Sequence, residues 1–355
     1  MNLEEVLILI RTPKIGPKRY FSLVQEYGSL DEILKHKASE FQFATLETVQ
    51  KEIKVAQKFG AEFVTYYDEH YPLNLKNISD SPVVLTVKGN KNLLKKSGLG
   101  IVGARNASST GKIIAGKIAK HISEQDYVIV SGLARGIDTS AHKGAINNGT
   151  IGVIGNGIDV FYPEENKNLQ MEIFEKGLVV SEFAFGSAPQ TQNFPIRNRI
   201  ISALSKGVLV VEAALKSGSL ITANLALEQG KEVMAVPGSP LDPRCLGTNQ
   251  LLKQGATLVE NFEDVLSVFG ELETPKTPIR ESIFYQKKTQ ESEKPLEYSK
   301  QSVLDNLSYV PILIDHLIED ANVAPNLLQS FLLELEIEEK IERHPGNKVA
   351  LKIKE

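Results

Sequence analysis

Residues 127–159 read YVIVSGLARGIDTSAHKGAINNGTIGVIGNGID, and this stretch decides the fold. Residues 127–130 and 150–154 are short apolar runs rich in β-branched side chains, which is typical of buried strands. The stretch between them is long enough for a helix, and a glycine-rich segment follows each run. A strand, a helix and a second strand in this order predict a right-handed βαβ unit with parallel strands.

The same alternation continues in both directions from this stretch. Helical patterns of about ten residues or more separate most of the later apolar runs. We therefore predict an α/β fold with an extended Rossmann-like, mainly parallel sheet in a domain over residues 63–270. The predicted strands are residues 63–66, 83–87, 99–102, 127–130, 150–154, 178–180, 207–211 and 232–236.

Three further regions flank this predicted domain. Residues 1–62 read as short helices. Their glycine turn PKIGPKR, residues 13–19, is similar to a phosphate-binding helix-hairpin-helix turn, although a plain helical bundle is the favoured interpretation. Residues 271–300 are polar and contain prolines, which indicates a linker. Residues 301–355 combine helices with a short terminal hairpin, which suggests a winged helix.

The composition is that of a globular protein in a reducing compartment. Hydrophobic residues make up 42% of the 355 residues, and no apolar run approaches the roughly 20 residues of a membrane span. The single Cys245 excludes an internal disulfide framework, and an acidic pair near the N-terminus argues against a signal peptide. We therefore expect a cytoplasmic protein without membrane contact.

The charge is unevenly distributed along the chain. A net charge of −4 excludes a globally basic nucleic-acid binder. Residues 81–120, however, contain lysines and Arg105 but no acidic residue. Such a field of one sign attracts phosphates, and a solvated basic face is the equally weighted alternative.

The loops after the predicted strands are the candidate site, because ligands of open parallel sheets bind beyond the carboxyl ends of the strands. These loops combine glycine with Ser, Arg or Asp, which favours anion binding by backbone N–H groups; ordinary tight turns are the alternative. The spacing of a P-loop is absent, and Val160 stands where the dinucleotide motif needs its third glycine. ATP hydrolysis and NAD binding are disfavoured, and we expect no cofactor.

Residues 192–201, QNFPIRNRII, supply a different kind of phosphate site. Arg197 and Arg199 could pair with successive phosphates while Phe194 stacks on a base. The alternative is that these arginines form structural salt bridges with acids such as Glu182 or Glu212.

Asp138 and His142 are four residues apart on one predicted helix, so they can touch. An acid–base pair is one interpretation, but a structural hydrogen bond is favoured because no nucleophile or metal cluster accompanies them. No histidine spacing suggests zinc. We therefore expect neither catalytic residues nor a metal site.

Four blocks of sequence together resemble the DNA-processing protein A family, also called DprA or Smf. The blocks follow in order at family-like spacing and cover most of residues 65–260. They are residues 102–105 (VGAR); 131–138 (SGLARGID) with 141–142 (AH); 154–159 (IGNGID) with 162–166 (YPEEN); and 194–201 (FPIRNRII) with 212–213 (EA) and 217–223 (SGSLITA).

The resemblance implies a DNA-binding function without catalysis. Proteins of this family bind single-stranded DNA that enters the cell in natural transformation, protect it, and help to load the recombinase RecA. Their extended Rossmann core commonly forms a homodimer. The resemblance also implies a sterile-alpha-motif-like domain at residues 1–62 and a winged helix at residues 301–355.

The motif positions imply the site residues. The implied phosphate contacts are Arg105, Arg197 and Arg199, with Asn193 and Phe194 beside them. The implied backbone or hydroxyl contacts are Gly103, Ser131, Gly132, Gly155, Ser217, Gly218 and Ser219. Two departures are Ala104, where the family usually has Ser, and Thr191-Gln192, where many relatives carry a basic residue.

Two other functions remain open from the sequence. A Rossmann-like nucleotide hydrolase of the lysine-decarboxylase-like type would need a Pro-Gly-Gly-x-Gly-Thr loop followed by a catalytic Glu. This chain has residues 216–222, KSGSLIT, and then Asn224 and Leu225 instead. A purely structural adaptor would leave the glycine-rich loops unexplained.

The expected recognition helix of the winged helix, residues 326–340, is acidic, with Glu334, Glu336, Glu338 and Glu339 against Lys340. Phosphates would be repelled by such a helix. We therefore expect this domain to contact protein rather than DNA.

Overall fold

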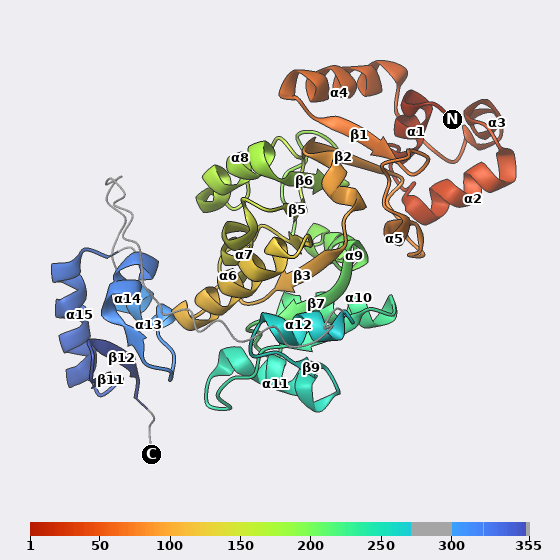
Figure 1. The fold of residues 1–355 in the computed structure, drawn as a ribbon. Helices are drawn as coiled ribbons and strands as arrows, with labels where there is room; N and C mark the ends of the chain where they lie inside the picture. Colours follow the sequence, from red (N-terminus) through yellow and green to blue (C-terminus); the bar gives the residue numbers. More distant parts are fainter. Residues whose placement is uncertain (271–299, 322, 353–355) are drawn as a thin grey trace. The chain divides into compact units, whose positions relative to one another are not determined.

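The computed structural model describes residues 1–270, 300–321 and 323–352 (Figure 1). These fall into two compact units, Met1–Ala107 with Gly111–Phe262, and Ser108–Thr110 with Glu263–Glu355. The N-terminal helices and the large sheet lie in the same unit, so the division between residues 1–62 and 63–270 stays a prediction. The predicted linker, residues 271–300, lies outside the described residues apart from Lys300.

The first unit is built on a nine-stranded sheet of order β1-β2-β6-β5-β4-β3-β7-β8-β9. Pairing is parallel from β6 through to β9, and β1 and β2 are antiparallel additions at one edge. The predicted mainly parallel α/β fold is therefore confirmed. The strands are β1 (Glu62–Thr65), β2 (Val84–Gly89), β3 (Gly98–Val102), β4 (Val128–Ser131), β5 (Thr150–Ile154), β6 (Leu178–Ser181), β7 (Ser205–Val210), β8 (Glu232–Ala235) and β9 (Thr257–Leu258).

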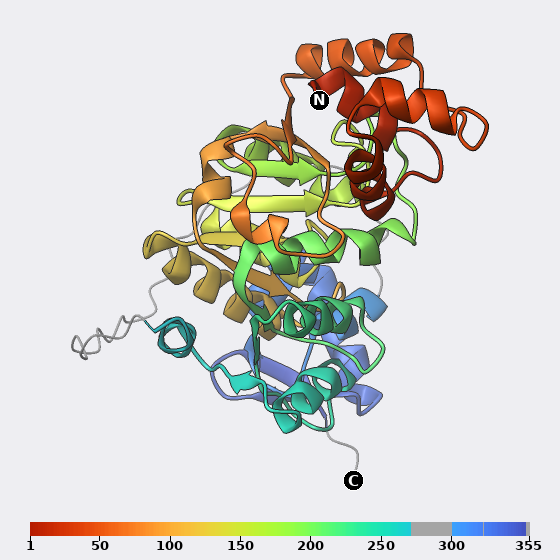
Figure 2. The same cartoon turned by 90° about the vertical axis from the view of Figure 1, so that its right-hand side faces the viewer.

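Helices cover both faces of this sheet, as Figures 1 and 2 show. The central strands β3, β4, β5 and β6 are buried along their whole length, which explains why they are continuous apolar runs rather than alternating ones. The helices are α6 (Ser109–Glu124), α7 (Ile137–Ala145), α8 (Lys167–Lys176), α9 (Asn193–Leu204), α10 (Gly218–Glu228) and α11 (Leu246–Lys253).

The order of the strands creates a switch point between β3 and β7. From β3 the chain moves outward through β4, β5 and β6, and it then returns to place β7 on the other side of β3. The loops that leave the carboxyl ends of β3 and β7 therefore run in opposite directions and leave a crevice. This crevice is where the topology predicts a ligand.

The N-terminal helices pack around a core of their own. They are α1 (Leu3–Ile10), α2 (Pro17–Tyr27), α3 (Leu30–Lys37) and α4 (Leu46–Phe59). Leu7, Tyr20, Ile33 and Val49 are fully buried or nearly so, and this cluster includes Val84 of β2. The core therefore joins the helices to the edge of the sheet.

In its described residues, the second unit contains α12 (Phe262–Val268) at its boundary, followed by three helices and a small antiparallel sheet in the arrangement of a winged helix. Its further elements are α13 (Lys300–Asn306), α14 (Ile314–Ala321), α15 (Pro325–Ile337), β10 (Ile312–Leu313), β11 (Ile341–His344) and β12 (Lys348–Leu351). Within the described parts of the chain, no helix combines the length and the apolar character that a membrane crossing requires.

Candidate nucleic-acid interface

Two adjoining cavities lie where the central strands end. One has a volume of about 370 Å³ and the other about 630 Å³. Arg105, Ala134, Arg135, Phe194 and Arg197 line both of them, so we treat the two cavities as one groove. The groove lies at the switch point that the strand order predicts.

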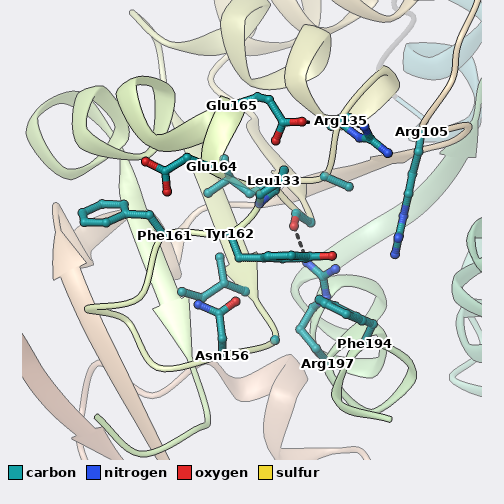
Figure 3. A pocket seen from close by; sticks show the side chains of 15 residues that line it. Arg105, Leu133, Arg135, Asn156, Phe161, Tyr162, Glu164, Glu165, Phe194 and Arg197 are labelled. Atoms are coloured by element: carbon teal, nitrogen blue, oxygen red, sulfur yellow. Dashed lines mark hydrogen bonds and ion pairs between the residues drawn. The ribbon is translucent and has the colours of Figure 1, made fainter. Parts of the chain in front are cut away.

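The loop after β3 and the start of α9 supply the central side chains of the groove. Phe194 and Arg197 are three residues apart on α9, so they lie on the same face of the helix. The guanidinium of Arg105 lies 5.5 Å from the centre of the Phe194 ring. Tyr162 also stacks on Phe194, as Figure 3 shows. The groove thus combines two aromatic rings with two cations.

Arg197 is a buried cation that the strand ends hold in place. Its Nη1 donates to the carbonyl oxygen of Gly132 at 2.6 Å and also to that of Val153. Burial lowers the pKa of Arg197 to about 10; the nearby Asp138 opposes this shift and Arg105 adds to it. Arg197 therefore remains charged at neutral pH, facing the groove from its floor.

Gly132 is required by this arrangement. A Cβ atom at this position would lie only 2.4 Å from Nη1 of Arg197. Any side chain there would displace the buried guanidinium. Gly132 of the SGLARGID block therefore leaves space for Arg197 of the FPIRNRII block.

Asp138 and His142 have structural roles. The Asp138 carboxylate accepts hydrogen bonds from the backbone N–H groups of Gly132 at 3.0 Å and Ala134 at 3.3 Å, which shapes the loop after β4. His142 bonds to the Thr150 hydroxyl at 2.7 Å. Among the hydrogen bonds of the described residues, none joins Asp138 to His142, so the two residues have separate partners.

The larger cavity ends at the start of α10. The Ser217 hydroxyl accepts a hydrogen bond from the Ser219 N–H at 3.3 Å and caps the helix. Lys216 is exposed directly before it. Gly103, Ser217, Gly218 and Ser219 line this cavity, as expected, while Gly132 and Gly155 line the smaller one. The helix start offers N–H groups and a positive dipole end to an anion.

Three predicted site residues do not line the groove. Arg199 is 5% exposed and pairs with Glu182 at 2.8 Å and with Asp80 at 3.0 Å. The Ser131 hydroxyl donates to the carbonyl oxygen of Ile101 inside the sheet. Asn193 is buried at the start of α9. For Arg199 the salt-bridge alternative is what the structure shows, so we withdraw it as a phosphate contact.

Several lysines of the acid-free run of residues 81–120 have partners elsewhere in the chain. Lys91 pairs with Glu62 and Lys96 with Asp126, both from other parts of the chain. Lys88 donates to the carbonyl oxygen of Phe59. Arg105 is the residue of this run whose charge reaches the groove.

Sequence reasoning did not assign several residues of the smaller cavity, among them Arg135, Asn156 and Tyr162. Each lies in a block that the sequence analysis quoted, so the strand-end position was available as a signal. Arg135 is exposed and faces Glu165 at 3.7 Å. Tyr162 could not be assigned because its contact with Phe194 joins two distant loops.

Comparisons with known proteins place the chain in a family. The model of the family described as DNA recombination-mediator protein A matches residues 62–270. The chain belongs to this family. A second model, the DprA winged helix domain, matches residues 287–347, which confirms the winged helix expected near the C-terminus.

Several DprA and Smf proteins are similar over most of their length. The DNA processing protein DprA of Streptococcus pneumoniae is 47% identical over 61% of this chain and 76% of its own. Protein Smf of Escherichia coli is 40% identical over 80% of this chain and 76% of its own. These matches confirm the resemblance to DNA-processing proteins that the four sequence blocks indicate.

Two solved DprA structures share the fold. The crystal structure of S. pneumoniae DprA aligns with a TM-score of 0.66 and 36% identity, covering 75% of this chain and 98% of its own. DNA processing protein A of Helicobacter pylori aligns with a TM-score of 0.54 and 30% identity, covering 59% and 96% respectively. The latter was described for its single-stranded DNA binding mode.

Proposed function

We propose that this protein binds single-stranded DNA along the groove and holds it without cleaving it. The observation that carries the proposal is the meeting of Arg105, Phe194 and Arg197 at the strand ends. Unpaired bases stack on aromatic rings while the phosphates between them pair with cations. The single-stranded DNA binding described for the H. pylori relative supports the same ligand.

The groove suggests a division of roles. Arg105 and Arg197 contact phosphates, and Phe194 stacks on a base. Backbone N–H and hydroxyl contacts complete the path to the start of α10, from Gly103, Gly155, Ser217, Gly218 and Ser219. Gly132 serves the path indirectly, because its N–H donates to Asp138 and its carbonyl oxygen holds Arg197. The proposed DNA path therefore runs from the Phe194 ring to the N-terminus of α10.

The acidic side chains of the groove argue against nucleotide hydrolysis. Asp138 is occupied by two backbone N–H groups, and Glu165 faces Arg135. The Ser131 hydroxyl beside Asp138 is buried in the sheet and donates to the carbonyl oxygen of Ile101, so it is not placed to act as a nucleophile. Incubation with nucleoside monophosphates should release no base or phosphate; such release would favour the hydrolase alternative.

Membership of the family supports a wider role. The protein would protect incoming single strands in the cytoplasm during natural transformation and assist the loading of RecA, as a homodimer through its Rossmann-like domain. Nuclease protection of a bound strand and faster RecA filament assembly would test the role. Analytical ultracentrifugation would test the dimer.

A salt titration tests the ligand itself. Labelled oligo-dT and a duplex are titrated with the wild type, with Arg105→Ala and with Lys143→Ala across a range of salt concentrations. Lys143 is the control because it is exposed in the last turn of α7 and is not among the residues that line the two cavities. We choose Arg105 over Arg197 because Arg105 is exposed and its loss leaves no carbonyl unpaired.

The expected result is a preference for the single strand and a salt slope that is shallower by about 0.7 in Arg105→Ala, the loss of one phosphate contact. Lys143→Ala should match the wild type. Equal binding of duplex and single strand, or identical slopes for all three proteins, would overturn the assignment.

A further inference from the structure

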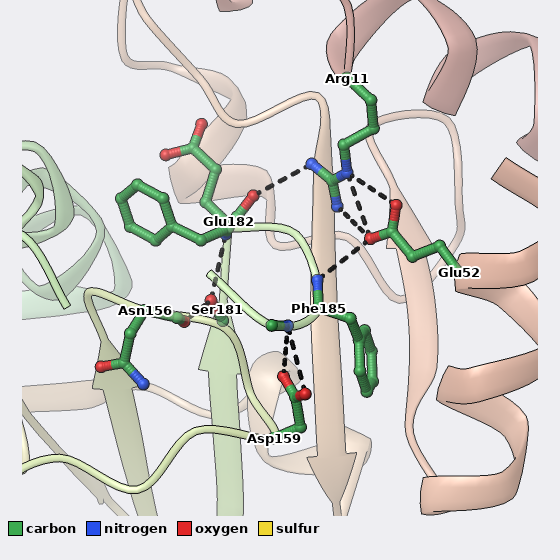
Figure 4. Close-up of polar contacts among 9 residues, drawn as sticks. Arg11, Glu52, Asn156, Asp159, Ser181, Glu182 and Phe185 are labelled. Atoms are coloured by element: carbon green, nitrogen blue, oxygen red, sulfur yellow. Dashed lines mark hydrogen bonds and ion pairs between the residues drawn. The ribbon is translucent and has the colours of Figure 1, made fainter. Parts of the chain in front are cut away.

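A partly buried ion pair joins two of the N-terminal helices at the point where they meet the sheet. Arg11 follows α1 and Glu52 lies on α4. Their side chains are 12% and 11% exposed, and Arg11 Nη2 lies 3.0 Å from Glu52 Oε1. Arg11 Nε adds further contacts at 3.1 and 3.2 Å, so the pair is bidentate (Figure 4). A bidentate pair fixes direction as well as distance.

The Arg11–Glu52 pair forms hydrogen bonds with the loop that follows β6. Nη1 of Arg11 donates to the carbonyl oxygen of Glu182 at 3.4 Å, and the Phe185 N–H donates to Glu52 at 3.4 Å. The far side of the loop is held by Asp159, which accepts from the Gly186 N–H at 2.9 Å. The loop after β6 is thus held on one side by the N-terminal helices and on the other by the loop after β5.

The Glu182 side chain carries the connection on to α9. Its carboxylate lies 2.8 Å from Nη2 of Arg199, whose Nη1 donates to the carbonyl oxygen of Ile196. Asp80 holds the same guanidinium from the segment before β2. Residues two apart on a helix point in nearly opposite directions, so Arg199 holds α9 from the face opposite Arg197.

We propose that Arg11 and Arg199 are positioning residues for the DNA groove. Through Glu182 and the loop after β6, the N-terminal helices set the rotation of α9, whose first turns carry Phe194 and Arg197 into the groove. This inference rests on the proposed function. The N-terminal helices therefore act on DNA affinity without touching DNA.

The chemistry of the network favours orientation over stability. A buried ion pair gains little net stability against a well-packed apolar substitute, because desolvation offsets its attraction. It does fix geometry, because each partner satisfies several hydrogen bonds at once. Four segments that are distant in sequence meet here, and Glu182 in the loop after β6 links the Arg11–Glu52 pair to the groove helix through Arg199.

A double-mutant cycle tests the inference with the full chain. Affinity for labelled oligo-dT is measured for the wild type, Arg11→Met, Phe194→Ala and the double variant. Fluorescence of a 2-aminopurine in the strand reports base stacking. Arg19→Met is the matched control, because Arg19 pairs with Glu40 in an exposed position on the same group of helices.

Arg11→Met should weaken binding roughly five-fold and reduce the stacking signal, and it should have almost no further effect once Phe194 is removed. Arg11→Lys keeps a charge for Glu52 and should recover part of the affinity. Arg19→Met should bind as the wild type does. If Arg11→Met does not fold, Glu52→Gln takes its place with the same expected coupling.

The two proposals fail in different ways. A wild type that does not bind oligo-dT contradicts the proposed function itself. If the wild type binds oligo-dT and Arg11→Met, or Glu52→Gln in its place, binds equally well, only the positioning role is overturned. The positioning role is also overturned if Arg11→Met lowers the affinity for oligo-dT by the same factor in the presence and in the absence of Phe194. A general loss of structure would act independently of Phe194 in this way.

Discussion

Tyr162, on the loop after β5, stacks on Phe194, in the first turn of α9, with ring centroids 5.7 Å apart and planes inclined by 27°. Arg105 lies over the same Phe194 ring. Contacts with an aromatic ring and with a guanidinium therefore keep the Phe194 ring in one orientation. A preset ring binds a base with a smaller loss of side-chain entropy.

Removing the Phe194 ring measures the contribution of stacking to DNA affinity separately from that of charge. Phe194→Ala should weaken the binding of oligo-dT by about 1–3 kcal/mol, the usual contribution of one base stacked on an aromatic ring. The salt slope should not change, because no cation is lost. Fluorescence anisotropy at several salt concentrations measures both quantities. Ile196→Ala is the control, since Ile196 is exposed on the same helix; an equal loss there would contradict the stacking role.

The two groove arginines should differ in their effect on stability. Arg197→Ala should lower the free energy of unfolding by roughly 3 kcal/mol, because it leaves buried Asp138 and two carbonyl oxygens without their cation. Arg105→Ala should change it by less than about 0.5 kcal/mol, since Arg105 is exposed. Urea unfolding of both variants measures the difference. Similar values would show that Arg197 is not held as the structure describes.

Much of the fold follows from local pattern. All eight predicted strands exist, with ends shifted by a few residues at most, because buried parallel strands are continuous apolar runs. β9 was missed because two residues, Thr257–Leu258, carry no periodicity. The antiparallel pairing of β1 and β2 was not predicted either, because strand direction depends on tertiary packing.

The site shows where local pattern stops being sufficient. Arg197 and Arg199 looked equivalent in sequence, yet a helix turns them to opposite faces, and the acids that pair with Arg199 come from other loops. The helical spacing alone was enough to predict that one of them would point away from a shared ligand. Which one faces the groove depends on Gly132 and Val153, whose positions only the folded sheet defines.

The winged helix should add little to single-strand affinity. Lys300 pairs with Glu334 and Glu338, and Leu333 and Ile337 are exposed on α15 between carboxylates. This helix offers phosphates no cation of its own. A chain of residues 1–270 should therefore bind oligo-dT within about two-fold of the full chain in a salt titration. A salt-dependent complex of residues 301–355 with DNA would contradict this expectation.

His142 should make the protein sensitive to acid. Its Nδ1 lies against Thr150, whose hydroxyl already donates to Ile129, so Nδ1 must carry the proton; Nε2 is buried without a hydrogen-bond partner. Protonation would place an unpaired charge in the core beside Arg197. Burial accordingly lowers the pKa of His142 to about 3, with Arg197 as a smaller cause.

The sign of the effect follows from this depressed pKa. Above the unfolded-state pKa, near 6.5, both states are neutral and stability is complete. Below that pH, His142 is protonated in the unfolded chain but stays neutral in the folded chain. The free energy of unfolding therefore falls by about 1.4 kcal/mol per pH unit until the pH nears the folded-state pKa. Urea unfolding at pH 7 and pH 5 should differ by about 2 kcal/mol more in the wild type than in His142→Gln, because glutamine cannot titrate. An equal pH dependence in both proteins would mean that His142 is protonated, or solvated, in the folded state.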